Sequence, residues 1–370
     1  MIPVSLVSCP TYRPEDVGIA ASLAIDLAGG FDPAGKTVLL KPNLLNASEP
    51  WKAVTTHPEV LRAAIRLCKT RGASRVLVGE SPGWQPVDGV ARRTGARAVA
   101  EEEGAAWADF SDVVRVEVPR GRVVRRFELA RAAVEADLLV SLPKLKTHKL
   151  MYFTGAAKNL FGIVPGLRKS QFHLRFPERR EFGAMIVDLV TAAKPAFALM
   201  DAIVGMEGPG PGNGTPRPLG WMLASRDCLA LDWVAGGLVG YDPWDIPYLA
   251  DARDRGILDA ASIHVEGLDP ETVRIRDFDR IRVLGDTDFF RTRLPGFLHR
   301  IARNLAVERP VFSDRNCVRC AGCVEICPAG ALAFRDGKTA PGIDYAACIR
   351  CYCCHEICPV DAIRLVSRPW

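Results

Sequence analysis

The chain has 370 residues, 48% of them apolar, so it is long enough to bury a sizeable core and to divide into one large and one small domain. Its 48 basic and 43 acidic residues give a formal net charge of +5, which excludes the strong basic footprint of a nucleic-acid-binding protein. No apolar run approaches the roughly 20 residues that cross a bilayer, so we expect no transmembrane segment. The twelve cysteines indicate a reducing compartment, the cytoplasm.

Short apolar runs alternate with helical patterns through the first two thirds of the chain. We expect strands at 4–7, 38–40, 75–78, 138–141, 197–200 and 222–224, and helices at 15–27, 58–69, 90–103, 127–135, 182–192 and 229–238. The alternation predicts an α/β fold over residues 1–243, a layered and mostly parallel sheet with crossover helices. Residues 244–311 are expected to form an irregular and helical connecting region, in which the aromatic and basic stretch 289–305 packs the large domain against a small module at 312–370.

Eight cysteines of that module form two runs with the same spacing, Cys-x2-Cys-x2-Cys-x3-Cys-Pro, which align as an internal duplication. This is the ligand spacing of a bacterial-type ferredoxin, a small α+β domain in which the last cysteine of each run binds the other cluster. We therefore expect two 4Fe-4S clusters, one held by Cys317, Cys320, Cys323 and Cys358 and the other by Cys348, Cys351, Cys354 and Cys327. Disulfides and zinc are the alternatives, but zinc sites usually pair two Cys-x2-Cys arms.

A ninth cysteine of the module, Cys353, lies between two of these ligands. We interpret it as a buried spare thiol, with a redox or ligand-swap role as the alternative. Most ferredoxins carry glycine after the second ligand of each run, where this chain has Ala321 and Tyr352. We interpret these two residues as local variation.

Polar residues follow four of the predicted strands, and ligands bind at such strand ends in an open parallel sheet. We expect a catalytic set in which Lys146 is an electrostatic clamp or proton donor and His148 transfers protons, together with Asp201 and Glu207. The residues expected to bind substrate are Lys41, Asn43, Glu80, Ser81, Lys144, Lys158 and Asn159. Lysines and a glycine loop favour an anionic substrate that carries a carboxylate or phosphate. The alternatives are surface lysines, a loop histidine that caps a carbonyl, and a turn or N-cap aspartate.

Several motifs resemble those of a known family. They are Lys41-Pro-Asn-Leu, Gly79-Glu-Ser-Pro-Gly, Pro143-Lys-Leu-Lys-Thr-His, Gly155-Ala-Ala-Lys-Asn-Leu-Phe-Gly and Asp201-Ala-Ile-Val-Gly-Met-Glu-Gly. Together they are similar to the domain of unknown function 362 family, over about the first 250 residues. Members of that family often carry a ferredoxin module. The resemblance implies the domain layout and the place of the site, and it implies no particular reaction.

Two main functions follow from these features. The first is a reductase whose clusters pass electrons to a small anionic substrate, or to an unseen cofactor, at the strand ends. We favour it because a pure electron carrier needs only the C-terminal module. The second is a non-catalytic electron-transfer or adaptor protein whose large domain docks a partner, and a maturation or sensor protein is a third. Under the first two functions we expect a redox donor or acceptor protein as partner.

Overall fold

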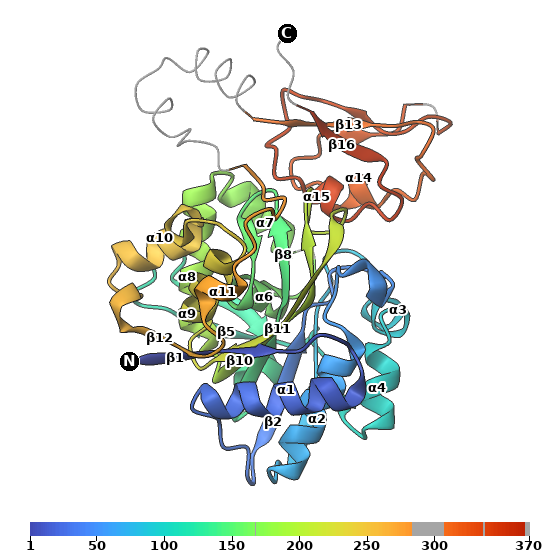
Figure 1. Cartoon of the computed structure of the whole chain (residues 1–370). Helices are drawn as coiled ribbons and strands as arrows, with labels where there is room; N and C mark the ends of the chain where they lie inside the picture. The colour runs from blue at the N-terminus through green and yellow to red at the C-terminus, as the bar shows by residue number, and fades with distance from the viewer. Residues whose placement is uncertain (167, 283–306, 336, 367–370) are drawn as a thin grey trace.

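A ten-stranded sheet forms the centre of the large domain in this computed structural model, which describes residues 1–166, 168–282, 307–335 and 337–366 (Figure 1). The strands are β1 (Ile2–Ser8), β2 (Thr37–Pro42), β3 (Arg75–Val78), β4 (Ala106–Trp107), β7 (Leu138–Leu142), β8 (Lys144–His148), β9 (Tyr152–Thr154), β10 (Phe197–Glu207), β11 (Thr215–Ser225) and β12 (Ile263–Gly267). Their order is β12-β1-β11-β10-β7-β2-β3-β4, and β8 pairs with β10 and β9.

Most pairings in this sheet are parallel. The parallel pairs are β1 with β12, β2 with β3, β2 with β7, β3 with β4, β7 with β10 and β8 with β10. The antiparallel pairs are β1 with β11, β10 with β11 and β8 with β9. The predicted α/β fold with a layered, mostly parallel sheet is therefore confirmed.

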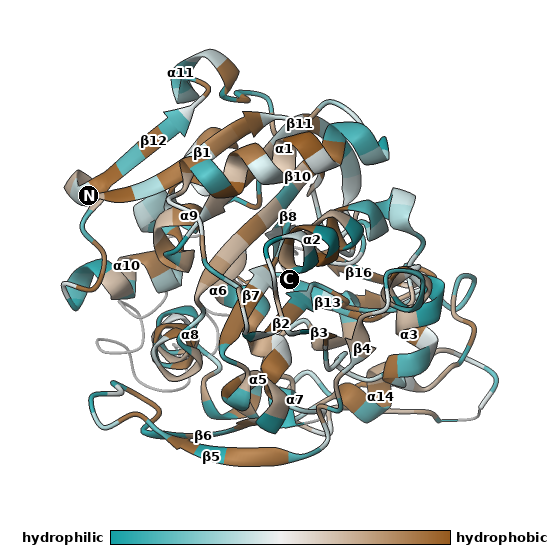
Figure 2. Ribbon diagram, turned by 90° about the horizontal axis from the view of Figure 1, so that it is seen from below, coloured by the Kyte–Doolittle hydropathy of each residue, from teal (hydrophilic) through white to brown (hydrophobic). Residues whose placement is uncertain are grey.

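Helices cover both faces of the sheet, which explains why its central strands are continuous apolar runs. In β2, Val38 and Leu40 belong to the core cluster that lies with α1 (Pro14–Leu27) and α2 (Pro58–Thr70). Leu39 points the other way, into the cluster that lies with α8 (Arg179–Ala193), α9 (Cys228–Leu238) and α10 (Pro247–Asp254). Figure 2 shows α1 and α2 on one side of the sheet and α8, α9 and α10 on the other.

The remaining helical segments of the large domain are short. They are α3 (Val87–Arg93), α4 (Ala96–Glu102), α5 (Arg131–Glu135), α6 (Ala156–Asn159), α7 (Arg168–Arg175) and α11 (Pro270–Val273), with 3-10 turns at Pro50–Lys52, Leu160–Ile163, Pro243–Asp245 and Ala260–Ser262. None of the helices in the described ranges is long and apolar enough to cross a membrane.

Two predicted helices differ from the structure. The stretch 90–103 is broken into α3 and α4 because Gly95 adopts a left-handed conformation, with φ of +78°, between them. The stretch 127–135 is a helix only in its second half. Its first half forms β6 (Arg126–Ala130), which pairs with β5 (Val113–Glu117) and buries Phe127 and Leu129 on alternate positions of a strand. The period of two was missed because only five residues carry it.

Part of the predicted connecting region packs on the large domain. Strand β12 pairs with β1 at the edge of the sheet, and α10 packs against α8. The stretch 289–305, for which we predicted a packing helix, lies outside the described residues.

The C-terminal module, in the residues that the structure describes, has two small sheets and two short helices. Strands β13 (Arg309–Phe312) and β16 (Ile363–Val366) pair antiparallel, as do β14 (Leu332–Ala333) and β15 (Gly342–Ile343). Helices α14 (Gly322–Ile326) and α15 (Cys353–Glu356) lie within the two cysteine runs and face the large domain (Figure 1).

Specific contacts fix the module on the large domain. Trp84 Nε1 donates to Glu325, Asn213 Nδ2 donates to the carbonyl of His355 at 2.9 Å, and Lys149 pairs with Glu308 at 2.9 Å. The module therefore meets the large domain where the polar strand ends lie.

Candidate functional site

The eight cysteines of the two runs surround two cavities in the module. One cavity is lined by Cys317, Cys320, Cys323 and Cys358, and the other by Cys327, Cys348, Cys351 and Cys354, with Cys353 beside them. All twelve cysteines are free thiols, so none is in a disulfide. In the described ranges no three histidines, cysteines or carboxylates converge as ligands of a single metal ion. Four thiols around a mostly apolar cavity fit a cluster better than a lone zinc ion.

The backbone around these cysteines is arranged to approach the sulfur atoms. Ala321 and Tyr352, the residues that replace the usual glycines, have φ of +64° and +65° and start α14 and α15. Both accept the left-handed conformation that normally favours glycine. The amides of Ala331 and Ala362 donate to Cys327 Sγ at 3.4 Å and Cys358 Sγ at 3.3 Å. Such hydrogen bonds tune the potential of an iron-sulfur cluster.

The predicted substrate residues at the ends of β2 and β3 form one buried network. Lys41 Nζ lies 2.5 Å from Glu80 Oε2 and donates to Asn159 Oδ1 at 3.1 Å. Asn43 Nδ2 donates to the same oxygen at 3.1 Å, and Asn43 Oδ1 accepts from Lys146 Nζ at 2.9 Å. The structure thus brings together five residues that the motifs singled out, and their polar groups satisfy one another.

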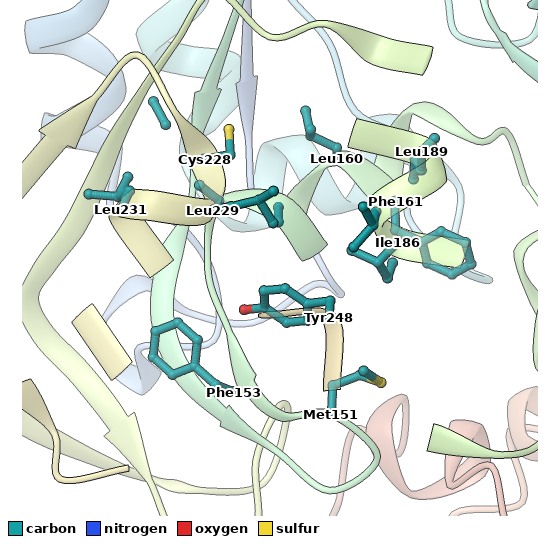
Figure 3. Packing of buried hydrophobic residues seen from close by; sticks show 14 of the residues in the cluster. Met151, Phe153, Leu160, Phe161, Ile186, Leu189, Cys228, Leu229, Leu231 and Tyr248 are labelled. Atoms are coloured by element: carbon teal, nitrogen blue, oxygen red, sulfur yellow. The ribbon is translucent and has the colours of Figure 1, made fainter. Parts of the chain in front are cut away.

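Tyr248 and Asp232 position the short helix that supplies Asn159 and Lys158. Figure 3 shows Tyr248 among the apolar side chains of the core, with Phe153 and Phe161. Its hydroxyl donates to Asp232 Oδ2 at 3.0 Å, and the same carboxyl group accepts from the amides of Ala156 and Ala157. Burial raises the pKa of Asp232 to about 7. A buried carboxyl group at the start of α6 therefore fixes the Ala-Ala-Lys-Asn turn.

Two of the predicted catalytic residues lie away from this network. Asp201 pairs with Lys144 at 2.9 Å, and both also bond to the Tyr12 hydroxyl, whose ring stacks on His57 at 3.7 Å. Lys144 and Asp201 are buried, so this pair supports strands β8 and β10. Glu207, at the end of β10, lies near Arg217 and accepts from the amide of Asp279. Neither carboxylate lines the two cysteine cavities or the cavity between the domains.

The polar residues that follow β7 form a strand of their own. Residues 144–148 form β8. Because successive side chains of a strand point to opposite faces, Lys144 and Lys146 lie on the other face from Leu145. His148 is fully buried at its end, and its Nδ1 accepts from the amides of Leu150 and Met151 at 3.1 and 3.3 Å. The ring proton therefore belongs on Nε2, which lies 3.3 Å from Glu356 Oε1 of the module. Burial holds the pKa of His148 well below its usual range.

A cavity of about 100 Å³ lies between the two domains. Its polar wall comes mainly from the large domain and contains Asn43, Glu80, Ser81, Lys158, Asn159, Lys169 and His173. Its apolar wall includes Ile326, Cys353 and Ile357 of the module, beside the carboxyl group of Glu356. Of the eleven large-domain residues predicted as site residues, Asn43, Glu80, Ser81, Lys158 and Asn159 reach this cavity, while Lys41 and Lys146 lie behind Glu80 and Asn43.

Lys158 is the cation in this cavity that is available to a ligand. Among the side chains that the structure describes, its ammonium has no hydrogen-bond or ion-pair partner, and it lies 5.9 Å from the centroid of the Phe161 ring. Lys169, by contrast, donates to the carbonyls of Ser81 and Val164. Burial lowers the pKa of Lys158 and lowers that of Lys169 to about 7. Burial disfavours the charged form of Lys158, and an anion bound beside its ammonium would stabilise that charge.

Three polar residues of the cavity, Glu356, His173 and Lys169, are not among the predicted site residues. Glu356 lies between two cluster cysteines, and burial raises its pKa to about 7 against the opposing effect of Lys158 and Lys146. His173 stacks on Phe182 at 4.4 Å, and its Nδ1 has no partner within the described part of the chain. Lys169 lies on α7, outside the motifs. Glu356 and Glu325 each stand directly before an Ile-Cys-Pro sequence. The local sequence therefore does not indicate that Glu356 is buried and Glu325 is exposed.

Comparisons with known proteins agree with the two parts of the chain. A model of the domain of unknown function (DUF362) matches residues 38–236, and a model of a 4Fe-4S dicluster domain matches residues 309–359. The chain is 33% identical over 264 residues to a thylakoid-associated protein of Synechocystis sp.. The matched region covers 69% of this chain and 79% of that relative.

Solved structures are similar to a lesser extent. The lactate racemase apoprotein from Thermoanaerobacterium thermosaccharolyticum has a TM-score of 0.38 and 16% identity, covering 60% of this chain and 53% of that chain. A protein from Thermotoga maritima has a TM-score of 0.36 and 13% identity, covering 57% and 55%. The chain spans only about half the length of each.

Proposed function

We propose a function for this chain on the premise that it belongs to the domain of unknown function 362 family and carries a 4Fe-4S ferredoxin-type domain, which binds iron and sulfur and transfers electrons. The chain is an oxidoreductase that holds two 4Fe-4S clusters and reduces a small anionic molecule bound between its domains. One observation carries the proposal: the walls of the interdomain cavity combine Lys158 with Cys353, which is adjacent in sequence to a cluster cysteine.

The residues of the two cysteine cavities hold the clusters as two sets of four, with Cys327 and Cys358 crossing between the runs. Each cavity has the four cysteines of one set in its lining, with Cys353 as a fifth in the second cavity, and the dicluster model spans both runs. When bound, such clusters supply electrons one at a time to a group close by.

The large domain binds and orients the anionic molecule. Lys158 attracts its carboxylate or phosphate, and the Ser81 hydroxyl offers a hydrogen bond from the polar wall. Lys41 and Lys146 hold Glu80 and Asn43 in place from behind. Lys146, whose pKa burial lowers to about 7, and His148, whose Nε2 lies beside Glu356, are the groups that can exchange protons at this wall. Asp201, Lys144 and Glu207 position strands β8 and β10.

A second candidate is an adaptor that only passes electrons to a docked protein. It is favoured by one observation, that Lys41, Lys144 and Lys146 at the strand ends are already occupied by internal partners. In both functions a redox protein supplies or removes electrons at the module. The free state of all twelve cysteines supports a reducing cytoplasm as the place of action.

The test starts from protein purified without oxygen, with iron counted and its clusters reduced by dithionite. A panel of small carboxylates and phosphate monoesters is added, and cluster reoxidation is followed by visible absorbance. We expect at least one compound to reoxidise the wild type quickly and Lys158→Ala more than tenfold more slowly at limiting concentration. Lys36→Ala, at a partly exposed lysine that pairs with Asp32 far from the cavity lining, is the matched control. If no compound is reduced, while a purified redox protein exchanges electrons at the same rate with both variants, the adaptor function holds instead.

A further inference from the structure

The interdomain cavity offers few groups to a ligand, because most polar side chains of its wall are engaged inside the protein. Both amide protons of Asn159 are used there, the first on the carbonyl of Lys41 at 3.1 Å. Lys41 also pairs with Glu80 at 2.5 Å, so that carboxylate adds no net charge to the wall. Lys169 donates to two backbone carbonyls. Among the described side chains of the wall, the cation left for a ligand is therefore the ammonium of Lys158.

This wall suits a single carboxylate better than a phosphate. Phosphate sites usually surround the oxygens with arginine side chains or several backbone amides, and the described residues that line this cavity include no arginine. The amide of Ser81 donates to the carbonyl of Gly162 at 3.2 Å, and the amide of Gly166 donates to Ser81 Oγ at 2.8 Å, so neither amide is free for a ligand. The carboxyl group of Glu356 in the lining opposes a second negative charge.

The opposite wall is apolar and the space is small. It includes Leu44, Leu45, Phe161, Ile326 and Ile357. The cavity measures about 100 Å³. Because a dry cavity of about 150 Å³ takes up benzene, with its six carbon atoms, a cavity of this size holds roughly four or five non-hydrogen atoms. A carboxylate with one or two further carbon atoms fills that space.

We propose that the interdomain cavity is a binding site for a monocarboxylic acid of two or three carbon atoms. Its carboxylate pairs with Lys158, and its short apolar body packs against Ile326 and Ile357 of the module. The Ser81 hydroxyl, which accepts from the amide of Gly166, keeps its own proton to donate to the bound acid. That the clusters reduce an acid of this class rests on the proposed function, whereas its binding rests on the cavity alone.

The test is isothermal titration calorimetry on the oxidised holoprotein, purified without oxygen, in a buffer free of carboxylate and phosphate. The titrants are acetate, propionate, butyrate, hexanoate and inorganic phosphate. We expect propionate to bind most tightly, and butyrate to bind about tenfold more weakly, because one methylene too many in a closed apolar pocket costs at least about that factor. Phosphate should not compete with propionate.

Two variants connect this binding to the named walls. Lys158→Met keeps the length of the side chain and removes its charge, so the affinity for propionate should fall at least about tenfold. Lys36→Met, at a lysine that pairs with Asp32 outside the lining, should not change it. Leu45→Ala enlarges the apolar wall and should make butyrate bind at least as tightly as propionate. Leu67→Ala, at a half-buried leucine of α2 outside the lining, should leave the order of the acids unchanged.

Several results would overturn the assignment. They are tighter binding of phosphate than of any acid, equal affinities for hexanoate and propionate, an unchanged affinity of Lys158→Met for propionate, and no binding of any short acid at millimolar concentration. No electron moves in these titrations, so the outcome is separate from that of the proposed reductase. An acid that binds but does not reoxidise reduced clusters leaves this site standing and argues against the reductase. Reoxidation by a phosphate monoester supports the reductase and refutes this site.

Discussion

Replacing Gly162 with alanine tests whether the buried ion pair at the strand ends holds the site together. Gly162 lies in the 3-10 turn Leu160–Ile163, and a Cβ there would overlap Glu80 Oε1 and lie 2.6 Å from Lys41 Nζ. These two groups pair at 2.5 Å, with side chains 0% and 5% exposed. Because neither group can move into water, the new methyl must push the carboxylate away from the ammonium or shift the turn.

Breaking a buried ion pair usually costs about 3–5 kcal/mol. Since Gly162→Ala separates the two groups without removing either, we expect a loss of about 3 kcal/mol in the free energy of unfolding. Urea denaturation followed by far-ultraviolet circular dichroism measures this loss. Gly18→Ala is the control, since nothing lies within 4 Å of its added Cβ in α1 and alanine there should stabilise by up to about 1 kcal/mol. Equal urea midpoints for Gly162→Ala and the wild type would refute the reasoning.

Three further outcomes are expected. Burial and, less strongly, Lys158 lower the pKa of His173 to about 3. The contribution of the neutral ring to stability is therefore complete above about pH 6.5 and is lost as the pH falls toward 3. His173→Phe should flatten the fall in melting temperature between pH 7 and pH 5, and an unchanged profile would contradict this. Trp84→Ala should speed proteolytic release of the module, whereas Trp51→Ala, at an indole 70% exposed, should not; equal rates would mean that Trp84 does not fix the interface. Removing iron with a chelator should unfold the module, while calorimetry should still show the unfolding transition of the large domain. If that transition also disappears, the folding of the two domains is interdependent.

The alternation of apolar runs and helical patterns was enough to predict the class of the fold. Strands 38–40 and 75–78 and helices 58–69 and 229–238 were placed within a few residues of the observed elements. The errors fell where the period was short or interrupted, at 127–130 and at Gly95. The family resemblance drawn from five motifs is confirmed by the match to residues 38–236.

The strand-end rule placed only some of the predicted site residues at the interdomain cavity. Asn43, Glu80 and Ser81 lie at the cavity, because they follow β2 and β3 at their carboxyl ends. Asp201 and Glu207 do not lie at the cavity, because both belong to the 11-residue strand β10. Their carboxylates pair with Lys144 and Arg217 on the neighbouring strands β8 and β11. The length of a strand inside a sheet depends on its neighbours, which a local pattern does not describe.

By itself, the sequence predicted the cluster ligands, since eight thiols spaced to wrap two cubes lie within 42 residues, from Cys317 to Cys358, and need no long-range contact to be recognised. Only the tertiary structure decided that Glu356 and Cys353 face Lys158, almost 200 residues away in the chain, while their duplicates Glu325 and Gly322 face Trp84. The reason is physical: the interdomain cavity is produced by the docking of two separately patterned domains, and the burial that sets its charges and hydrogen bonds does not exist until they meet.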